Sequence, residues 1–410
     1  MYDTQGLQFG KEVSMSATGR IVSLKRESFE CSGLTSAIGD LVQIQGRRNR
    51  VKGIVTGFRD GRVVGELFEN PIGIEVEALV VSNQEPPSIP IGNGILGRAL
   101  NSVGEPIDGK GPLEVGELHP LFGAASQMAP EPIEQLETGL RVLDALVPVD
   151  KRQQLMLWAP YGSGLGSRTM LEIIGRNCKA DVVIYAQIGV SSEEYKYFYK
   201  EVSKISEKAT LFATLQHATP VAHRICLESA VTAATAFAGQ GKNVVLMVDS
   251  FSAWRNAGEF FGYGISEKLE RLRSCSSGSV TSFFLVEHLL EEEIRKEEQN
   301  CGFDGRLVLS KEFARANIYP TVDPTKSAAS RRFRLDYKSD HFNALEILRE
   351  YQNNKDLIKM EALPVGVSPE LDRVLGKGKE LLKFIRQGVF EEAPLEKTRL
   401  RLKRLLSEES

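Results

Sequence analysis

Apolar runs of strand length alternate with amphipathic runs of helical length through the middle of the chain, and this alternation limits the fold more than any other feature. The apolar runs include LMLWA, DVVIYAQIG, ATLFATL, NVVLMVDS and VTSFFLVEHLL, separated by stretches such as TMLEIIGRNC and RICLESAVTAATAFAGQG. Strands that are apolar throughout and joined by helices are typical of a parallel sheet covered on both faces. The sequence therefore predicts an α/β core.

The segments on either side of this core have different patterns. From Gly19 to about Ser82, short alternating or apolar runs are separated by Gly, Asn and Asp, which predicts a small β-barrel. A Pro- and Gly-rich stretch follows, and after Asp340 apolar residues recur at helical spacing. We expect an N-terminal β-barrel at 1–85, an α/β core at 86–335 that includes a linker at 86–135, and a C-terminal helical domain at 336–410.

Composition narrows the class of protein. The 410 residues are 42% hydrophobic, enough for two or three domains with their own cores. The 51 Lys and Arg residues balance 54 Asp and Glu residues, so the bulk charge indicates no nucleic-acid partner. The five cysteines are scattered without metal-binding spacing, and the apolar runs are too short to span a bilayer. We expect a cytoplasmic protein.

A Gly-rich turn lies between a predicted strand and a predicted helix in LMLWAPYGSGLGSRTMLEIIGR, residues 155–176. Such a turn lets backbone N–H groups and the helix dipole converge on phosphate oxygens. A phosphate-binding loop normally ends in Gly-Lys-Ser/Thr, whereas Gly166 is followed here by Ser167 and Arg168. A strand-to-helix turn that binds nothing is the alternative. The candidate nucleotide-binding residues are Gly162, Ser163, Gly164, Leu165, Gly166, Ser167, Arg168 and Thr169.

Asp249 ends the apolar run NVVLMVDS, about 80 residues after the Gly-rich turn. A carboxylate in this place can position the water shell of a magnesium ion bound to nucleotide phosphates. An Asp at the end of a strand is often only a cap or turn residue. Together with the turn upstream, Asp249 is predicted to belong to a metal site.

Several longer segments carry a resemblance to a known family. They are GFRDGRVV (57–64), IPIGNGILGRALNSVGEPIDGKGPL (89–113), LETGLRVLDALVPV (136–149), GKNVVLMVDS (241–250), DGRLVLS (304–310), IYPTVDP (318–324) and FIRQG (384–388). With these segments the chain resembles the flagellar and virulence type III secretion export ATPases, relatives of the rotary ATP synthase alpha and beta subunits.

The resemblance implies a RecA-like P-loop core that binds ATP and magnesium at the subunit interfaces of a six-membered ring, made of one chain or of two. It also implies a β-barrel crown and a C-terminal helical domain that faces chaperones and secretion substrates. Further implied partners are export-apparatus proteins and a stator-type regulator, which would hold the ring at the cytoplasmic face of the export apparatus, peripheral to the membrane.

The chain departs from the family pattern at the residues that the family uses for phosphate binding and for activating water. The position of the family's P-loop Lys holds Ser167, and that of its Ser/Thr holds Arg168; a one-residue slip would instead present Arg168 and Thr169. The family's water-activating Glu corresponds to Val190, which cannot accept a proton. Glu193 or Glu194 is a possible substitute, but at the start of a helix either residue is more typical of stabilising the N-terminus. A positioned base contributes about 10²- to 10⁴-fold in rate.

Three other features bear on the site. The Pro-rich loop that faces the central channel in the family is missing after Asp249, which predicts poor coupling to a central stalk. Tyr319 matches the aromatic residue that stacks near adenine, although a core tyrosine is an equally ordinary interpretation. Arg331, with Arg332 as its alternative, resembles the arginine that reaches into a neighbouring subunit's site; a surface arginine pair is the other interpretation.

The expected function is therefore that of a subunit of a type III protein export ATPase ring, flagellar or virulence-associated, whose ATP hydrolysis is reduced or lost. A divergent but active export ATPase is one alternative. A non-catalytic structural paralogue assembled with an active ATPase is the other.

Overall fold

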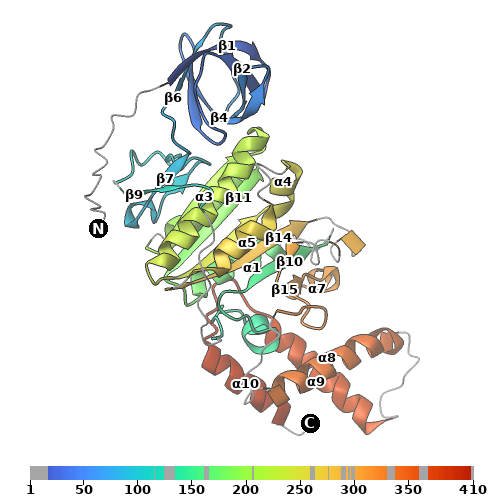
Figure 1. Cartoon of the computed structure of the whole chain (residues 1–410). Coiled ribbons are helices and arrows are strands. Elements are labelled where there is room, and N and C mark those ends of the chain that lie inside the picture. Colours follow the sequence, from blue (N-terminus) through green and yellow to red (C-terminus); the bar gives the residue numbers. More distant parts are fainter. Residues whose placement is uncertain are drawn as a thin grey trace, which may run out of the picture.

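The computed structural model describes three regions that follow one another from the barrel to the C-terminal helices (Figure 1). It describes residues 17–114, 116–123, 134–160, 166–205, 207–258, 264–275, 277–287, 292–293, 296, 301–329, 338–359 and 368–407. No helix in these ranges is both long and apolar enough to cross a bilayer.

Six strands near the N-terminal end close into a barrel in the order β1-β2-β5-β4-β3-β6. They are β1 (Ala17–Leu24), β2 (Ser28–Ser32), β3 (Leu41–Gln45), β4 (Arg50–Arg59), β5 (Arg62–Leu67) and β6 (Leu79–Ser82). Buried and half-buried side chains alternate along β2 and β3, because one face of each strand lines the interior. Phe29 fills that interior, where a Cβ on Gly65 would lie 2.3 Å from its ring. The predicted β-barrel is confirmed.

The segment after β6 connects the barrel to the α/β core. Its strands β7 (Ser88–Ile91) and β9 (Glu117–Pro120) pair with each other, and the short 3₁₀-helix η1 (Asn93–Ile95) lies between them in sequence. Strand β8 (Ala99–Leu100) adds to the edge of the main sheet beside β12. The described residues of the linker therefore form strands, one of which is an edge strand of the core.

The main sheet has the order β15-β10-β14-β13-β11-β12-β8 within the described residues, and its neighbouring strands are parallel. Its remaining strands are β10 (Gln154–Ala159), β11 (Val182–Val190), β12 (Ala209–Leu215), β13 (Asn243–Asp249), β14 (Ser279–Glu287) and β15 (Gly305–Val308). The strands are buried along nearly their whole length, as both-face coverage requires. The predicted RecA-like α/β core is confirmed.

Helices cover the sheet and connect its strands. They are α1 (Gly166–Asn177), α2 (Ser192–Lys204), α3 (Pro220–Gly239), α4 (Phe251–Asn256), α5 (Ile265–Arg273) and α7 (Lys311–Arg315). Four of them begin at a side-chain cap, because the hydroxyl of the preceding Ser or Thr accepts a hydrogen bond from a backbone N–H of the first turn; these caps are Ser191, Thr219, Ser250 and Ser310.

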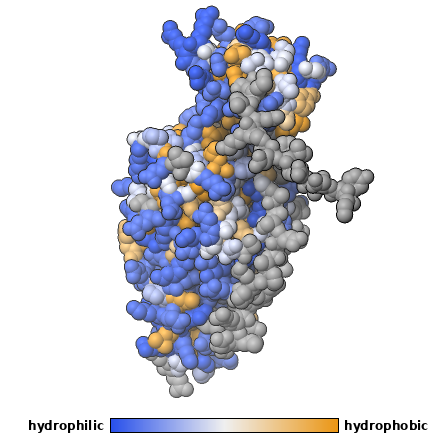
Figure 2. Space-filling model, turned by 60° about the vertical axis from the view of Figure 1, so that its left-hand side comes forward, coloured by the Kyte–Doolittle hydropathy of each residue, from blue (hydrophilic) through white to orange (hydrophobic). Residues whose placement is uncertain are grey.

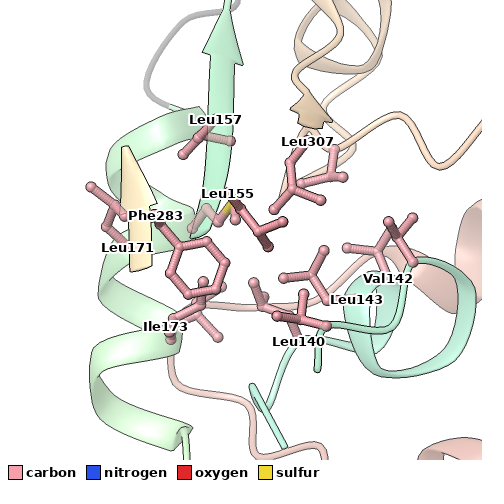
Figure 3. Packing of buried hydrophobic residues seen from close by; sticks show 14 of the residues in the cluster. Leu140, Val142, Leu143, Leu155, Leu157, Leu171, Ile173, Phe283 and Leu307 are labelled. Carbon is pink, nitrogen blue, oxygen red and sulfur yellow. The ribbon is translucent and has the colours of Figure 1, made fainter. Parts of the chain in front are cut away.

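Helix α1 is fixed in place by a dense apolar cluster. Leu171 and Ile173 of α1 pack toward Leu155 of β10 and Phe283 of β14, and the π-helical turn η2 (Val142–Leu146) closes the cluster from the other side (Figure 3). These side chains are fully buried. The start of α1, where the Gly-rich turn leads into the helix, is therefore held by the core.

Three helices follow the core and pack against one another: α8 (Lys338–Lys359), α9 (Pro369–Ile385) and α10 (Leu395–Ser407). The side chain of Gln387, just after α9, joins them to the core. Its Oε1 accepts a hydrogen bond from Arg141 N at 3.0 Å, and its Nε2 donates to Gly139 O at 2.7 Å. The predicted C-terminal helical domain is confirmed.

We expect the variant Gly175→Ala to lower the free energy of unfolding by about 1–3 kcal/mol. A Cβ at Gly175 would lie 1.7 Å from the hydroxyl oxygen of Tyr185, whose ring is fully buried against α1. The matched control is Gly376→Ala in α9, where a Cβ meets no atom within 4 Å. Better helix propensity should stabilise that variant by up to about 1 kcal/mol. Urea midpoints that move in the same direction for both variants would contradict this account of α1 packing.

Candidate functional site

The candidate residues gather at one edge of the main sheet, because neighbouring parallel strands end there together. Strand β10 ends at Ala159 before the Gly-rich turn, β11 ends at Val190 before α2, β13 ends at Asp249, and β14 ends at Glu287. Of the predicted phosphate-binding residues, Gly162, Ser163, Gly164 and Leu165 lie outside the described residues.

The first turn of α1 comes directly after the Gly-rich turn and carries the remaining phosphate-binding candidates. The helix begins at Gly166, and Ser167 is only 4% exposed. The Arg168 guanidinium forms an ion pair with the Glu194 carboxylate of α2. Thr169 is half-buried. The cation in this turn is thus Arg168, and it is engaged by a carboxylate of the same chain.

Glu194 has two roles in this arrangement. It is the third residue of α2, and its Oε2 accepts a hydrogen bond from Ser191 N at 2.9 Å while Ser191 Oγ accepts one from Glu194 N at 3.2 Å. This reciprocal pair is a capping box, so the predicted N-terminal role is confirmed for Glu194. Glu193 is exposed on the same turn. The other oxygen of Glu194 faces Arg168, so one carboxylate connects the starts of α1 and α2.

Val190 lies at the end of β11 in apolar and backbone surroundings. Its side chain is 6% exposed, and its carbonyl accepts a hydrogen bond from Gln216 N at 3.0 Å. The preceding Gly189 has a φ of 68°, in the left-handed region that favours glycine. Gly189 N donates to Thr214 Oγ1 at 3.2 Å, and that hydroxyl is 2.8 Å from His223 Nδ1. The end of this strand offers no carboxylate.

Asp249 is the buried carboxyl group of the site, with 8% of its surface exposed. The pKa of Asp249 is raised to about 6: burial is the main cause and the nearby Glu287 carboxylate contributes, while the hydrogen bond from Gln187 and the charge of Arg168 act in the opposite direction. Gln187 Nε2 donates to Asp249 Oδ2 at 3.3 Å. Gln187 Oε1 is buried without a hydrogen-bond partner among the described residues. Asp249 therefore lies in a dry environment that disfavours its charge.

The described donor set does not suit a magnesium ion. Magnesium is held in proteins by ionised carboxylate and hydroxyl oxygens, often together with substrate phosphates. Here burial favours the protonated form of Asp249, and the position expected to supply a hydroxyl carries the Arg168 guanidinium. No group of three or more acidic, His or Cys side chains converges anywhere in the described parts of the chain.

For a nucleotide, the described residues that fit are the N-terminal turn of α1 and the half-buried Tyr319. Tyr319 O accepts a hydrogen bond from Gln387 N at 2.8 Å. The same loop after α9 binds the far end of α1, where the Arg176 guanidinium lies 4.5 Å over the Phe390 ring and donates to Val389 O at 3.2 Å. One loop thus contacts both Tyr319 and α1. The arginine-finger candidates Arg331 and Arg332 lie outside the described residues.

Sequence reasoning missed three contributors to the site: Gln187, Glu287 and the pairing of Arg168 with Glu194. Gln187 is a polar residue inside an otherwise apolar strand, and Glu287 ends β14 in the same way that Asp249 ends β13. Both residues could therefore have been identified from the sequence. The ion pair between Arg168 and Glu194 could not be identified from the sequence, because it depends on how α1 and α2 are oriented at the sheet edge.

A cleft lies away from these residues. It has a volume of about 610 Å³ and is bordered by Lys52 and Phe68 of the barrel, Tyr195 of α2, and Leu215 and His217 near the end of β12. None of the candidate nucleotide or metal residues lines it. This cleft is therefore separate from the candidate site.

Comparisons with known proteins identify relatives of both halves of the chain. Residues 139–263 match the nucleotide-binding domain of the ATP synthase alpha/beta family. Residues 339–404 match the C-terminal domain of the type III secretion ATPase EscN. The first match contains the Gly-rich turn, Val190 and Asp249, and the second contains most of the three C-terminal helices.

Curated relatives cover nearly the full length. The flagellum-specific ATP synthase of Treponema pallidum is 30% identical, and the alignment covers 93% of this chain and 91% of the relative. That of Aquifex aeolicus is 29% identical, with 94% and 92% covered. The type 3 secretion system ATPase of Xanthomonas euvesicatoria is 25% identical, with 84% and 87% covered.

Among solved structures, the assembled ATPase EscN of the enteropathogenic Escherichia coli type III secretion system has the same fold, with a TM-score of 0.83. It is 22% identical, and the match covers 95% of this chain and 100% of the other. EscN in complex with its central stalk EscO matches equally well, at a TM-score of 0.83 and 23% identity.

We expect Asp249→Asn to stabilise the protein at pH 7.5 relative to the wild type. The pKa of Asp249 is raised from 3.8 to about 6, so the folded state holds the proton more tightly than the unfolded chain does. Wild-type stability should therefore decrease as the pH rises from about 4 to 6, by about 2 to 3 kcal/mol from this group. The variant lacks this decrease, and its amide gives the buried Gln187 Oε1 a donor.

The measurement is the difference in unfolding midpoint between Asp249→Asn and the wild type from pH 3.5 to 8. The difference should be small near pH 3.5 and should grow to its full value above pH 6. A difference that is constant with pH would show that Asp249 ionises normally.

Proposed function

Because the chain belongs to the family of flagellar and type III secretion export ATPases, we propose that it is a subunit of such an ATPase ring whose own ATP hydrolysis is reduced or lost. The family supplies the activity, which is ATP hydrolysis coupled to the export of proteins. The residues at the candidate site of this chain are the reason why we propose that ATP hydrolysis is reduced or lost. ATP remains the nucleotide that the family fold is built to bind.

The observation that carries the proposal is the first turn of α1. A compact ammonium on this turn would reach the β and γ phosphates. The buried Ser167 has no charge to offer, and the Arg168 guanidinium is paired with Glu194. Arginine is also a planar fork rather than a point charge, so it is a poor replacement in a tight loop.

The second loss is the general base. Val190 ends β11 at the place where the family has its water-activating carboxylate, and its side chain has no proton-accepting group. The absence of a positioned base costs about 10²- to 10⁴-fold in rate, or roughly 3 to 5 kcal/mol of barrier. Either loss alone slows turnover, and the two act on different parts of the reaction.

Assembly into a ring is supported by the surface of the barrel. Its exposed hydrophobic side chains include Ile38, Phe58, Ile72 and Val76. Figure 2 shows a face that is mainly hydrophilic, with hydrophobic residues on the barrel and just below it and others scattered further down the molecule. Phe342, Phe390 and Leu400 in the C-terminal region are exposed as well. Apolar side chains left in water favour contact with another subunit. The proposed partners are further ring subunits, export-apparatus proteins, chaperones and secretion substrates.

A divergent but active ATPase is the second candidate. Glu194 favours it, since a carboxylate lies beside the first turn of α1. Against it, both carboxylate oxygens of Glu194 already have partners, Ser191 N and the Arg168 guanidinium. Before Glu194 could act as the general base, it would have to lose its ion pair with Arg168 and its hydrogen bond to the N-cap of α2.

We expect steady-state ATP hydrolysis by the wild-type chain to be at least about 100-fold slower than that of an intact family enzyme assayed beside it. Restoring the family residues with Ser167→Lys, Arg168→Thr and Val190→Glu together should raise the rate by at least about tenfold. The restored protein with Asp249→Asn added is the matched control, because it should lose that gain. Wild-type turnover equal to that of the family enzyme would refute the proposal.

A further inference from the structure

We propose that the Glu194 carboxylate is an internal competitor for nucleotide phosphate at the first turn of α1. This inference rests on the proposed function for the location of the nucleotide, but it concerns affinity rather than turnover. The claim is that the chain occupies this position with an anion of its own, so that removing the charge of this one side chain raises the affinity for phosphate.

Three polar pairs among the described residues join α1 to α2 and determine where Glu194 lies. Their members recur every three or four residues on each helix, so the pairs form a ladder along the two helices. Two are ion pairs, and in the third a tyrosine hydroxyl donates a hydrogen bond to a carboxylate. The pairs are Arg168 with Glu194, Glu172 with Tyr197, and Arg176 with Glu201. The ladder therefore holds the Glu194 carboxylate beside the start of α1.

The start of α1 is where an anion is most stable. Helices α1 and α2 both begin at the carboxyl edge of the sheet, and the positive ends of their dipoles stabilise negative charge there. Glu194 already supplies that charge, because it pairs with the Arg168 guanidinium and accepts a hydrogen bond from Ser191 N at 2.9 Å. A carboxylate attached to the same chain competes at an effective concentration on the order of millimolar or higher. An incoming phosphate group must therefore displace it.

The ion pair is accessible enough for the arginine to change partners. The side chains of Arg168 and Glu194 are 32% and 29% exposed, so their mutual attraction is reduced by solvent. With Glu194 neutral, the Arg168 guanidinium could donate two hydrogen bonds to phosphate oxygens, a geometry that arginine favours. The repulsion between the Glu194 carboxylate and the phosphates would also be gone. Both effects act in the direction of tighter phosphate binding.

The test is a calorimetric titration with ATP and, separately, with inorganic pyrophosphate, both without divalent metal. Glu194→Gln should bind each of them at least about fivefold more tightly than the wild type does. Glutamine can keep the capping box with Ser191, so this variant removes the charge and retains the helix start. The gain should shrink in about 1 M NaCl, because salt screens a charge effect between partly exposed groups. A gain that came only from altered packing would not respond to salt in this way.

The matched control is Glu201→Gln at the other end of the ladder. Glu201 Oε2 lies 2.6 Å from Arg176 Nη2, so this variant also takes a carboxylate from an arginine between the same two helices. Arg176 lies about 12 Å further along α1 than Arg168, and the control should bind phosphate as the wild type does. Adding Arg168→Gln to Glu194→Gln should abolish the gain, because it removes the cation that receives the phosphate. If Glu194→Gln folds poorly, Glu194→Ala removes the same charge and provides the same measurement.

Three results would overturn the inference. The first is a folded, neutral Glu194 variant that binds neither compound more tightly than the wild type, and the second is an equal gain in Glu201→Gln. The third is a gain for ATP that pyrophosphate does not share, since the effect would then lie outside the phosphate position. None of these titrations measures hydrolysis, so the two proposals fail separately. Rapid ATP hydrolysis by the wild type would refute only the proposed loss of turnover.

Discussion

The parallel pairing of β10, β14, β13 and β11 is the constraint on which the rest of the structure depends. It brings the ends of four strands, and the starts of α1 and α2, to one edge of the sheet. The positive ends of the helix dipoles at that edge stabilise negative charge. Burial at the strand ends disfavours an ionised carboxylate unless a cation lies close to it. In this chain Glu194 supplies the negative charge and Arg168 supplies the positive charge.

Much of the fold could be predicted from the sequence, because the patterns that specify it are local. The run NVVLMVD, which is apolar between its two end residues, becomes the central strand β13, and the alternation around Leu41–Gln45 becomes a barrel strand with one buried face. The helix start at Glu194 could also be predicted, since Ser191 and Glu194 have the spacing of a capping box. These features need no knowledge of distant contacts.

The candidate site was predictable only in part. Asp249 and Val190 could be placed at strand ends, but the partners of Asp249 come from β11 and β14, and sequence periodicity does not state which strands are neighbours. The ion pair joins two helices whose relative orientation is set by packing, such as the fit of Gly175 against Tyr185. Arg168 could be recognised as an unusual residue, whereas its partner could be found only in three dimensions.

The loop after α9 has a mechanical consequence. Gln387 connects it to Tyr319, Gly139 and Arg141, and Arg176 connects it to the end of α1. A displacement of α9 would therefore be transmitted through this loop to both Tyr319 and helix α1. None of these contacts involves the residues at the carboxyl ends of β11 and β13, so movement of the C-terminal helices would reach Tyr319 and α1 whether or not the protein hydrolyses ATP.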